Sequence, residues 1–136
     1  MNIMIPYITI PGSCEDALNF YKNCFSGEIV FLQRYIEIED YPVSKEYEMK
    51  IAHSEFCADG IHFFASDGVE GQHVISGNNI ALSVSFDTKD KQLATFEKLK
   101  VDGEITMGFS ETSVNSILVT LIDKYGIHWA LNYDHD

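Results

Sequence analysis

An internal repeat limits the folds open to this chain more than any other feature of its sequence. Residues 60–63 read Gly-Ile-His-Phe, and residues 126–129 read Gly-Ile-His-Trp, at a shift of 66 positions. Earlier in each half, residues 27–29 and 103–105 both read Gly-Glu-Ile, at a shift of 76. A loop that is ten residues shorter in the second half accounts for the difference between the two shifts. Self-similarity of this kind is typical of a supersecondary unit that occurs twice.

The first half of the chain has the periodicity of one strand, one helix and three further strands. Alternation of side chains predicts a strand at residues 6–10, and apolar residues at helical spacing predict a helix near residues 13–25. Ser13 and Asp16 have the spacing of a capping box at the start of this helix. Runs rich in β-branched and aromatic residues predict three more strands, at residues 29–36, 49–58 and 61–65. The first half therefore reads βαβββ, and the repeat predicts the same order in the second half, with its helix near residues 87–101.

The length and composition of the chain favour one domain of the α+β class. With 136 residues, of which 46% are hydrophobic, the chain can bury one substantial core. We expect a single domain over residues 1–136, with module one at 1–67 and module two at 79–136. The intervening residues 68–78 are rich in glycine and polar side chains, which is typical of a linker.

The charge of the chain is strongly negative. Nine lysine and arginine residues oppose 21 aspartate and glutamate residues, which gives a net charge of −12. A field of this sign repels nucleic-acid phosphates and anionic membranes and attracts cations. The N-terminal residues show no signal-peptide pattern, and no apolar run of about 18 residues occurs. We therefore expect a cytoplasmic protein that binds neither nucleic acid nor membrane.

Three stretches carry a resemblance to a known superfamily: residues 6–29 (PYITIPGSCEDALNFYKNCFSGEI), 51–67 (IAHSEFCADGIHFFASD) and 123–132 (DKYGIHWALN). They resemble the vicinal oxygen chelate superfamily, which includes glyoxalase I, extradiol dioxygenases and the fosfomycin- and bleomycin-resistance proteins, and more narrowly its PhnB-like branch. The resemblance implies paired βαβββ modules that form a cup-shaped mixed sheet, usually in a homodimer. It does not imply the methyltransferase activity for which that branch is often labelled, because the sequence lacks a glycine-rich turn for a nucleotide cofactor.

Metal-using members of this superfamily take their ligands from the first and last strands of each module. At the matching positions this chain has side chains that are not usual ligands of divalent metals: Ile5 or Tyr7, Phe64, Ala81 and Ala130. The sequence therefore predicts that the protein holds no stoichiometric transition metal and no cofactor. An unorthodox site stays open as an alternative, in which His62 and His128 approach each other and Glu55 or His53 completes the ligand set.

Strand periodicity predicts which side chains line the open side of the cup. Ile8, Ile10, Phe63 and Trp129 should pack under the helices, and the residues that alternate with them should contact a ligand. The predicted lining residues are Tyr7, Thr9, His62, Phe64, Ser83, His128 and Asn132. This mixture of aromatic surface and hydrogen-bonding groups is typical of a small-molecule pocket, and the negative charge favours a neutral or cationic ligand.

Four further residues have two interpretations each. Arg34, the only arginine, can bind a carboxylate or phosphate of a ligand, or it can form an ion pair within the protein. His53 and Glu55 lie two apart on one strand face and can form a catalytic pair or a structural polar pair. Cys14, in the first turn of the first helix, can be a reactive thiol but is more typical of a packing residue.

The sequence favours a metal-free module that binds a small organic molecule. The alternative is a glyoxalase-like lyase or isomerase, or a dioxygenase-type enzyme, with an unorthodox site around His53, Glu55, His62 and His128. A scaffold whose cup is filled by its own side chains is a third hypothesis. PhnB-like relatives often have Phe-Trp-Gly after the threonine that matches Thr112, whereas residues 113–115 here read Ser-Val-Asn, so the ligand should differ from theirs.

Overall fold

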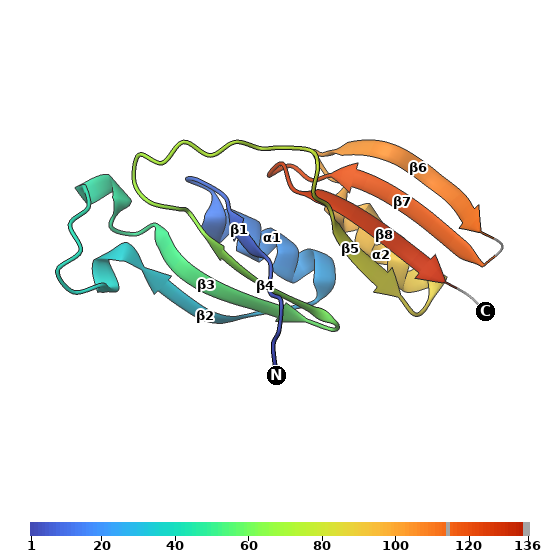
Figure 1. Ribbon diagram of the computed structural model, residues 1–136, viewed down its shortest axis with the longest axis horizontal. Helices are drawn as coiled ribbons and strands as arrows, with labels where there is room; N and C mark the ends of the chain where they lie inside the picture. The colour runs from blue at the N-terminus through green and yellow to red at the C-terminus, as the bar shows by residue number, and fades with distance from the viewer. Residues whose placement is uncertain (114, 135–136) are drawn as a thin grey trace. The chain divides into compact units, whose positions relative to one another are not determined.

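The protein is described from a computed structural model, which describes residues 1–113 and 115–134 (Figure 1). The chain forms two compact units, Met1–Val74 (unit 1) and Ile75–Asp136 (unit 2). Each unit contains one four-stranded sheet and one α-helix, which confirms the predicted α+β class with two βαβββ modules. Among the described residues, no helix has the length and apolar character needed to cross a membrane. The single domain and the linker at residues 68–78 stay predictions.

Unit 1 contains the elements β1 (Tyr7–Thr9), α1 (Cys14–Phe25), β2 (Glu28–Arg34), β3 (Ile51–Ala58) and β4 (Ile61–Ser66). Its sheet has the order β1-β4-β3-β2, in which β1 runs parallel to β4 and the other neighbours are antiparallel. Two short 3-10 helices, η1 (Tyr35–Glu37) and η2 (Lys45–Tyr47), lie in the polar connection between β2 and β3.

Unit 2 repeats this topology with the elements β5 (Leu82–Phe86), α2 (Lys89–Leu99), β6 (Glu104–Ser113), β7 (Ser116–Ile122) and β8 (His128–Asp134). Its strand order is β5-β8-β7-β6, and β5 runs parallel to β8. Each element of unit 2 therefore has a counterpart in unit 1, as the sequence repeat predicts.

The glycine of the first repeat meets a backbone requirement in both units. Gly60 precedes β4 with a φ angle of 71°, and Gly126 precedes the equivalent strand β8 with a φ angle of 85°. Side chains with a Cβ atom rarely adopt such angles, whereas glycine does so at little cost. The repeated Gly-Ile-His therefore marks the entry to one structural position that the chain forms twice.

The glycine of the second repeat permits a close approach of two backbone segments. A Cβ atom at Gly27 would lie 2.8 Å from the carbonyl oxygen of Cys57, and one at Gly103 would overlap the carbonyl oxygen of Ile122. Both contacts join the start of one strand to the neighbouring antiparallel strand. The same steric constraint therefore explains the glycine in both Gly-Glu-Ile sequences.

We expect Gly103→Ala to lower the free energy of unfolding by about 1–3 kcal/mol, because the added methyl group forces a shift of the Ile122 carbonyl. Urea denaturation followed by circular dichroism measures the change. Gly108→Ala is the matched control on β6, since a Cβ atom there meets nothing within 4 Å. Equal stability of the two variants would contradict the steric explanation.

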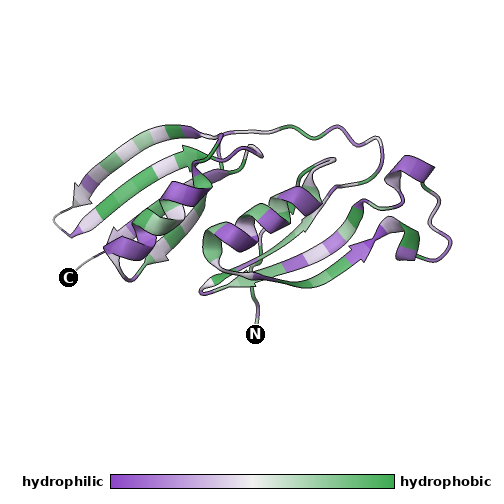
Figure 2. Ribbon diagram, turned by 180° about the vertical axis from the view of Figure 1, so that it is seen from behind, coloured by the Kyte–Doolittle hydropathy of each residue, from purple (hydrophilic) through white to green (hydrophobic). Residues whose placement is uncertain are grey.

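The core of each unit lies between its helix and one face of its sheet. In unit 1 the ring of Phe63 stacks on Phe56 with centroids 4.8 Å apart and meets Tyr21 edge-on at 5.6 Å. In unit 2 Trp129 and Leu131 are buried under α2. Both helices in Figure 2 carry hydrophilic and hydrophobic bands, as expected for helices that cover a sheet with one side. The inward direction predicted for Phe63 and Trp129 is confirmed.

The predicted capping box at the start of α1 is wrong. The Ser13 side chain makes no capping hydrogen bond. Instead, the backbone N–H of Cys14 donates to Asp67 Oδ1 at 3.1 Å, and the N–H of Ile51 donates to Asp67 Oδ2 at 2.7 Å. A buried carboxylate directly after β4 therefore accepts hydrogen bonds from both the start of α1 and the start of β3.

Candidate functional site

The sheet of unit 1 carries a row of four rings on the face turned away from α1. The row consists of Tyr7, Phe64, His53 and Phe31, one from each of the strands β1, β4, β3 and β2, and we call it the ring row. Ring centroids are 5.9 Å apart for Tyr7 and Phe64, 5.0 Å for Phe64 and His53, and 5.9 Å for His53 and Phe31. The rings therefore form a continuous aromatic surface across the sheet.

The two ends of the ring row are open to solvent. Tyr7 is 51% exposed and Phe31 is 48% exposed, whereas the alternating residues Ile8 and Phe63 are buried. Large exposed rings that lie together on one surface are typical of contact sites. Tyr7 and Phe64 lie together on this face, and their contact with a ligand stays a prediction, whereas sequence analysis missed Phe31.

Hydrogen bonds hold the polar side chains around the ring row. The Tyr7 hydroxyl and His53 Nδ1 share a hydrogen bond of 3.0 Å, and His62 Nε2 and Glu55 Oε2 lie 2.6 Å apart. The ring of His62 meets Phe64 edge-on at 5.7 Å, so this pair borders the row. His53 and Glu55 lie on one face, as predicted, but each bonds to a different partner.

Arg34 lies at the end of β2 and bonds to α1. Its guanidinium donates to both carboxylate oxygens of Glu15, at 3.0 and 2.7 Å, and to the carbonyl oxygen of Met49 at 2.7 Å. The hydrogen bonds from Arg34 to Glu15 lower the pKa of the Glu15 carboxyl. The structure thus supports the interpretation of Arg34 as an internal ion-pair partner.

Thr9, another predicted lining residue, lies two residues after Tyr7 on β1 and is half-buried.

The predicted site residues of unit 2 lie on its two parallel strands, the edge strand β5 and its neighbour β8. Ser83 on β5 is paired in register with Ala130 on β8. On β8, Ala130 lies midway between His128 and Asn132. Ser83 is exposed, and the other two predicted residues are half-buried. His128 also lines a hollow of about 490 Å³ beside the segment at residues 76–78. Like Phe64 and Ala81, Ala130 has a side chain without an atom that can coordinate a metal.

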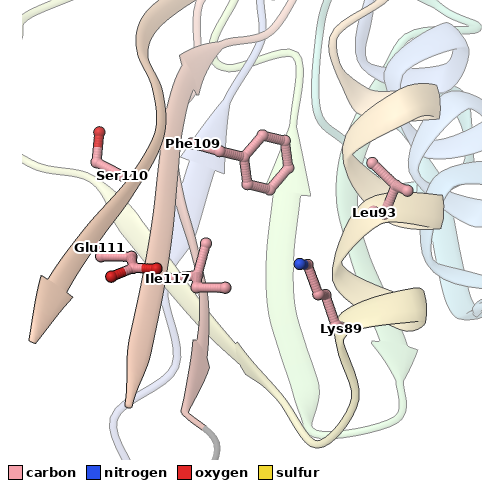
Figure 3. Close-up of a pocket in the computed structure, with 6 residues that line it drawn as sticks. All are labelled: Lys89, Leu93, Phe109, Ser110, Glu111 and Ile117. Carbon is pink, nitrogen blue, oxygen red and sulfur yellow. The ribbon is translucent and has the colours of Figure 1, made fainter. Parts of the chain in front are cut away.

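A second pocket in unit 2 was missed by sequence analysis. It has a volume of about 290 Å³ and lies between α2 and the strands β6 and β7 (Figure 3). Its lining residues are Lys89, Leu93, Phe109, Ser110, Glu111 and Ile117. Figure 3 shows Phe109 and Leu93 on the two sides of this pocket. The spacing of Leu93 and Phe109 in the sequence resembles that of ordinary core residues, so the sequence carries no signal for the pocket.

Val114, in the segment that differs from the PhnB-like pattern, lies outside the described residues.

The thiol of Cys14 is protected from reaction. Burial, reinforced by the nearby Asp67 carboxylate, raises its pKa to about 12. Because the thiolate is the reactive form, Cys14 is inert at neutral pH. This supports its interpretation as a packing residue.

Comparison with known proteins identifies the family. The family model described as 3-demethylubiquinone-9 3-methyltransferase matches residues 2–132. The chain belongs to this family. Protein YjdN of Escherichia coli (strain K12) is 25% identical, over 93% of this chain and 92% of that protein.

Solved structures share the fold of this chain. The PhnB protein of Bacillus cereus, described with the same methyltransferase name, is 28% identical, covers 97% of this chain and 99% of its own, and superposes with a TM-score of 0.77. A glyoxylase/bleomycin resistance protein/dioxygenase domain from Frankia sp. EAN1pec shares the fold at 12% identity, over 100% of this chain and 93% of its own, with a TM-score of 0.66. The resemblance to the PhnB-like branch is confirmed.

Proposed function

We propose that this protein binds a small organic molecule on the ring row, without a metal ion at the positions where its superfamily holds one and without chemical change of the ligand. The ring row is the observation that carries the proposal. Four rings from four strands, each tilted by 51–60° to the next, offer ring faces and edges against which a flat molecule can pack, and the exposure of Tyr7 and Phe31 leaves them accessible.

The polar groups around the ring row favour a neutral or cationic ligand. Aromatic faces attract cations through their quadrupole, and the carboxylate of Glu55 lies beside the row next to His62. The net charge of −12 adds a field that concentrates cations at low ionic strength. The one arginine is already engaged with Glu15, so it gives an anionic ligand no support.

An enzyme of the lyase or isomerase type is the second candidate, and one observation favours it. His62 lies 2.6 Å from Glu55, and a carboxylate that orients an imidazole is a common arrangement for proton transfer. The two functions differ in the fate of the ligand: a binding protein returns the molecule unchanged, whereas an enzyme releases a product. A homodimer and a cytoplasmic location remain part of the proposal, from the resemblance and the sequence.

We expect Phe64→Ala to weaken the binding of a flat organic cation by about 5- to 10-fold, because it removes one of the two inner rings of the row, worth about 1–1.5 kcal/mol of aromatic contact. Isothermal titration calorimetry with 1-methylquinolinium measures the change. Phe109→Ala is the matched control, since Phe109 is also partly exposed but lines the pocket of unit 2. Weakening by Phe109→Ala alone would move the binding site to unit 2 and contradict the proposal.

A further inference from the structure

A cluster of three metal-binding side chains lies on the β3–β4 hairpin of unit 1. We propose that Glu55, Cys57 and His62 together bind a divalent transition-metal ion such as zinc. A carboxylate oxygen of Glu55, the sulfur of Cys57 and a ring nitrogen of His62 all lie within 4.8 Å of one another. The proposed function does not use this ion, and the site is separate from the superfamily's metal positions, which hold Phe64, Ala81 and Ala130 here.

The hairpin backbone fixes the three side chains on one face. Cys57 and His62 are directly paired across β3 and β4, and Glu55 lies two residues before Cys57 on the same strand. The two-residue turn Asp59-Gly60, with its glycine at a φ angle of 71°, ties the two strands together. Ligands held by neighbouring strands of a tight hairpin lose little freedom when an ion binds, which favours affinity.

The chemistry of the three groups selects a transition metal. Thiolate, imidazole and carboxylate are the usual zinc ligands, at about 2.0–2.3 Å from the ion, so the ligand atoms of a tetrahedral site lie roughly 3–4 Å apart. The side chains of His62 and Glu55 are 39% and 32% exposed, which leaves them room for the small adjustment needed. The thiolate disfavours magnesium and calcium, which prefer oxygen ligands.

Zinc binding at this site requires one hydrogen bond to break and one proton to leave. The hydrogen bond of 2.6 Å between His62 Nε2 and Glu55 Oε2 joins two atoms through which these residues can coordinate the ion. Binding therefore breaks this hydrogen bond and releases the thiol proton of Cys57 to solvent. Three protein ligands then leave a fourth position for water, while the bound charges of the thiolate and carboxylate neutralise the divalent ion.

The test measures zinc binding and thiol protection on the same reduced, untagged protein. We expect one zinc ion per chain, by competition with a chromophoric chelator, and slower alkylation of Cys57 by iodoacetamide when zinc is present. Cys14 and Cys24 are buried and should stay unmodified in both conditions, so they report that the protein is folded. Magnesium should give no protection. Unchanged alkylation of Cys57 in saturating zinc would overturn the proposal.

Two variants locate the ion. Cys57→Ser and His62→Gln should each weaken zinc binding by about tenfold or more, since each removes one of three ligands. His128→Gln, in unit 2, is the control and should bind zinc as the unchanged protein does. Zinc binding that survives both hairpin variants would overturn the proposal. Cys57→Ser should still bind 1-methylquinolinium, because Cys57 is not part of the ring row, so failure of the metal site and failure of the proposed function give different results.

Discussion

Trp129→Ala should lower the free energy of unfolding by about 3–5 kcal/mol, the usual cost of removing a large aromatic side chain from a core. Trp129 is 2% exposed and lies in the core of unit 2. Its ring nitrogen donates to Asp123 Oδ2 at 2.8 Å, so the substitution also leaves a buried carboxylate without this donor. Because Trp129 is the only tryptophan, urea unfolding must be followed by circular dichroism.

The control for Trp129→Ala is Leu93→Ala, which truncates an apolar side chain that is 46% exposed in the same unit. Substitutions at such positions cost about 1 kcal/mol or less. A loss for Trp129→Ala as small as that of the control would contradict the assignment of Trp129 to the core.

Asp67→Ala should cost about 2–6 kcal/mol of stability, because it leaves two backbone N–H groups without their acceptor, at about 1–3 kcal/mol each. These are the N–H groups of Cys14, at the start of α1, and of Ile51, at the start of β3. Hydrogen exchange should show faster exchange at both amides, and urea denaturation gives the total change.

The variant Asp67→Asn tests how much of that loss comes from the missing acceptor oxygens. Its amide keeps one acceptor oxygen, so it should recover part of the stability that Asp67→Ala loses. Asp87→Ala removes an exposed aspartate and should change the stability little. If Asp67→Ala were as stable as Asp87→Ala, the buried carboxylate would have no role as a cap.

The sequence predicts the topology of each unit because the signals are local. A glycine at positive φ and the alternation of side chains along a strand are properties of a few consecutive residues, and both occur twice in this chain. The two repeats therefore reveal the duplicated βαβββ order, and the alternation gives the buried side of Phe63 and Trp129.

The candidate site was predicted only in part because it depends on strand register. Phe31 should face the same side as Ile29 by simple alternation, but a register shift between them pairs Ile29 with Phe56 and Phe31 with Glu55. This irregularity turns Phe31 onto the open face and completes the ring row. No pattern of residue types in the sequence marks its place.

Contacts between side chains far apart in the sequence escaped prediction for the same reason. Sequence analysis considered His62 as a partner of His128, whereas the hairpin register places it opposite Cys57 and beside Glu55. The cap of α1 comes from Asp67, which is distant in sequence from Cys14 and adjacent in space. Such pairs follow from the folded arrangement and carry no local signature.

The most direct test of ligand binding on the ring row is a titration of ¹⁵N-labelled protein followed by amide resonances in NMR spectra. Two flat bicyclic probes of similar size and opposite charge are compared: 1-methylquinolinium and quinoline-2-carboxylate. We predict saturable shifts with the cation at Tyr7, Phe31, His53 and Phe64, and recovery of the cation unchanged. Saturable binding of the anion alone, or shifts confined to the residues that line the pocket of unit 2, would contradict ligand binding on the ring row.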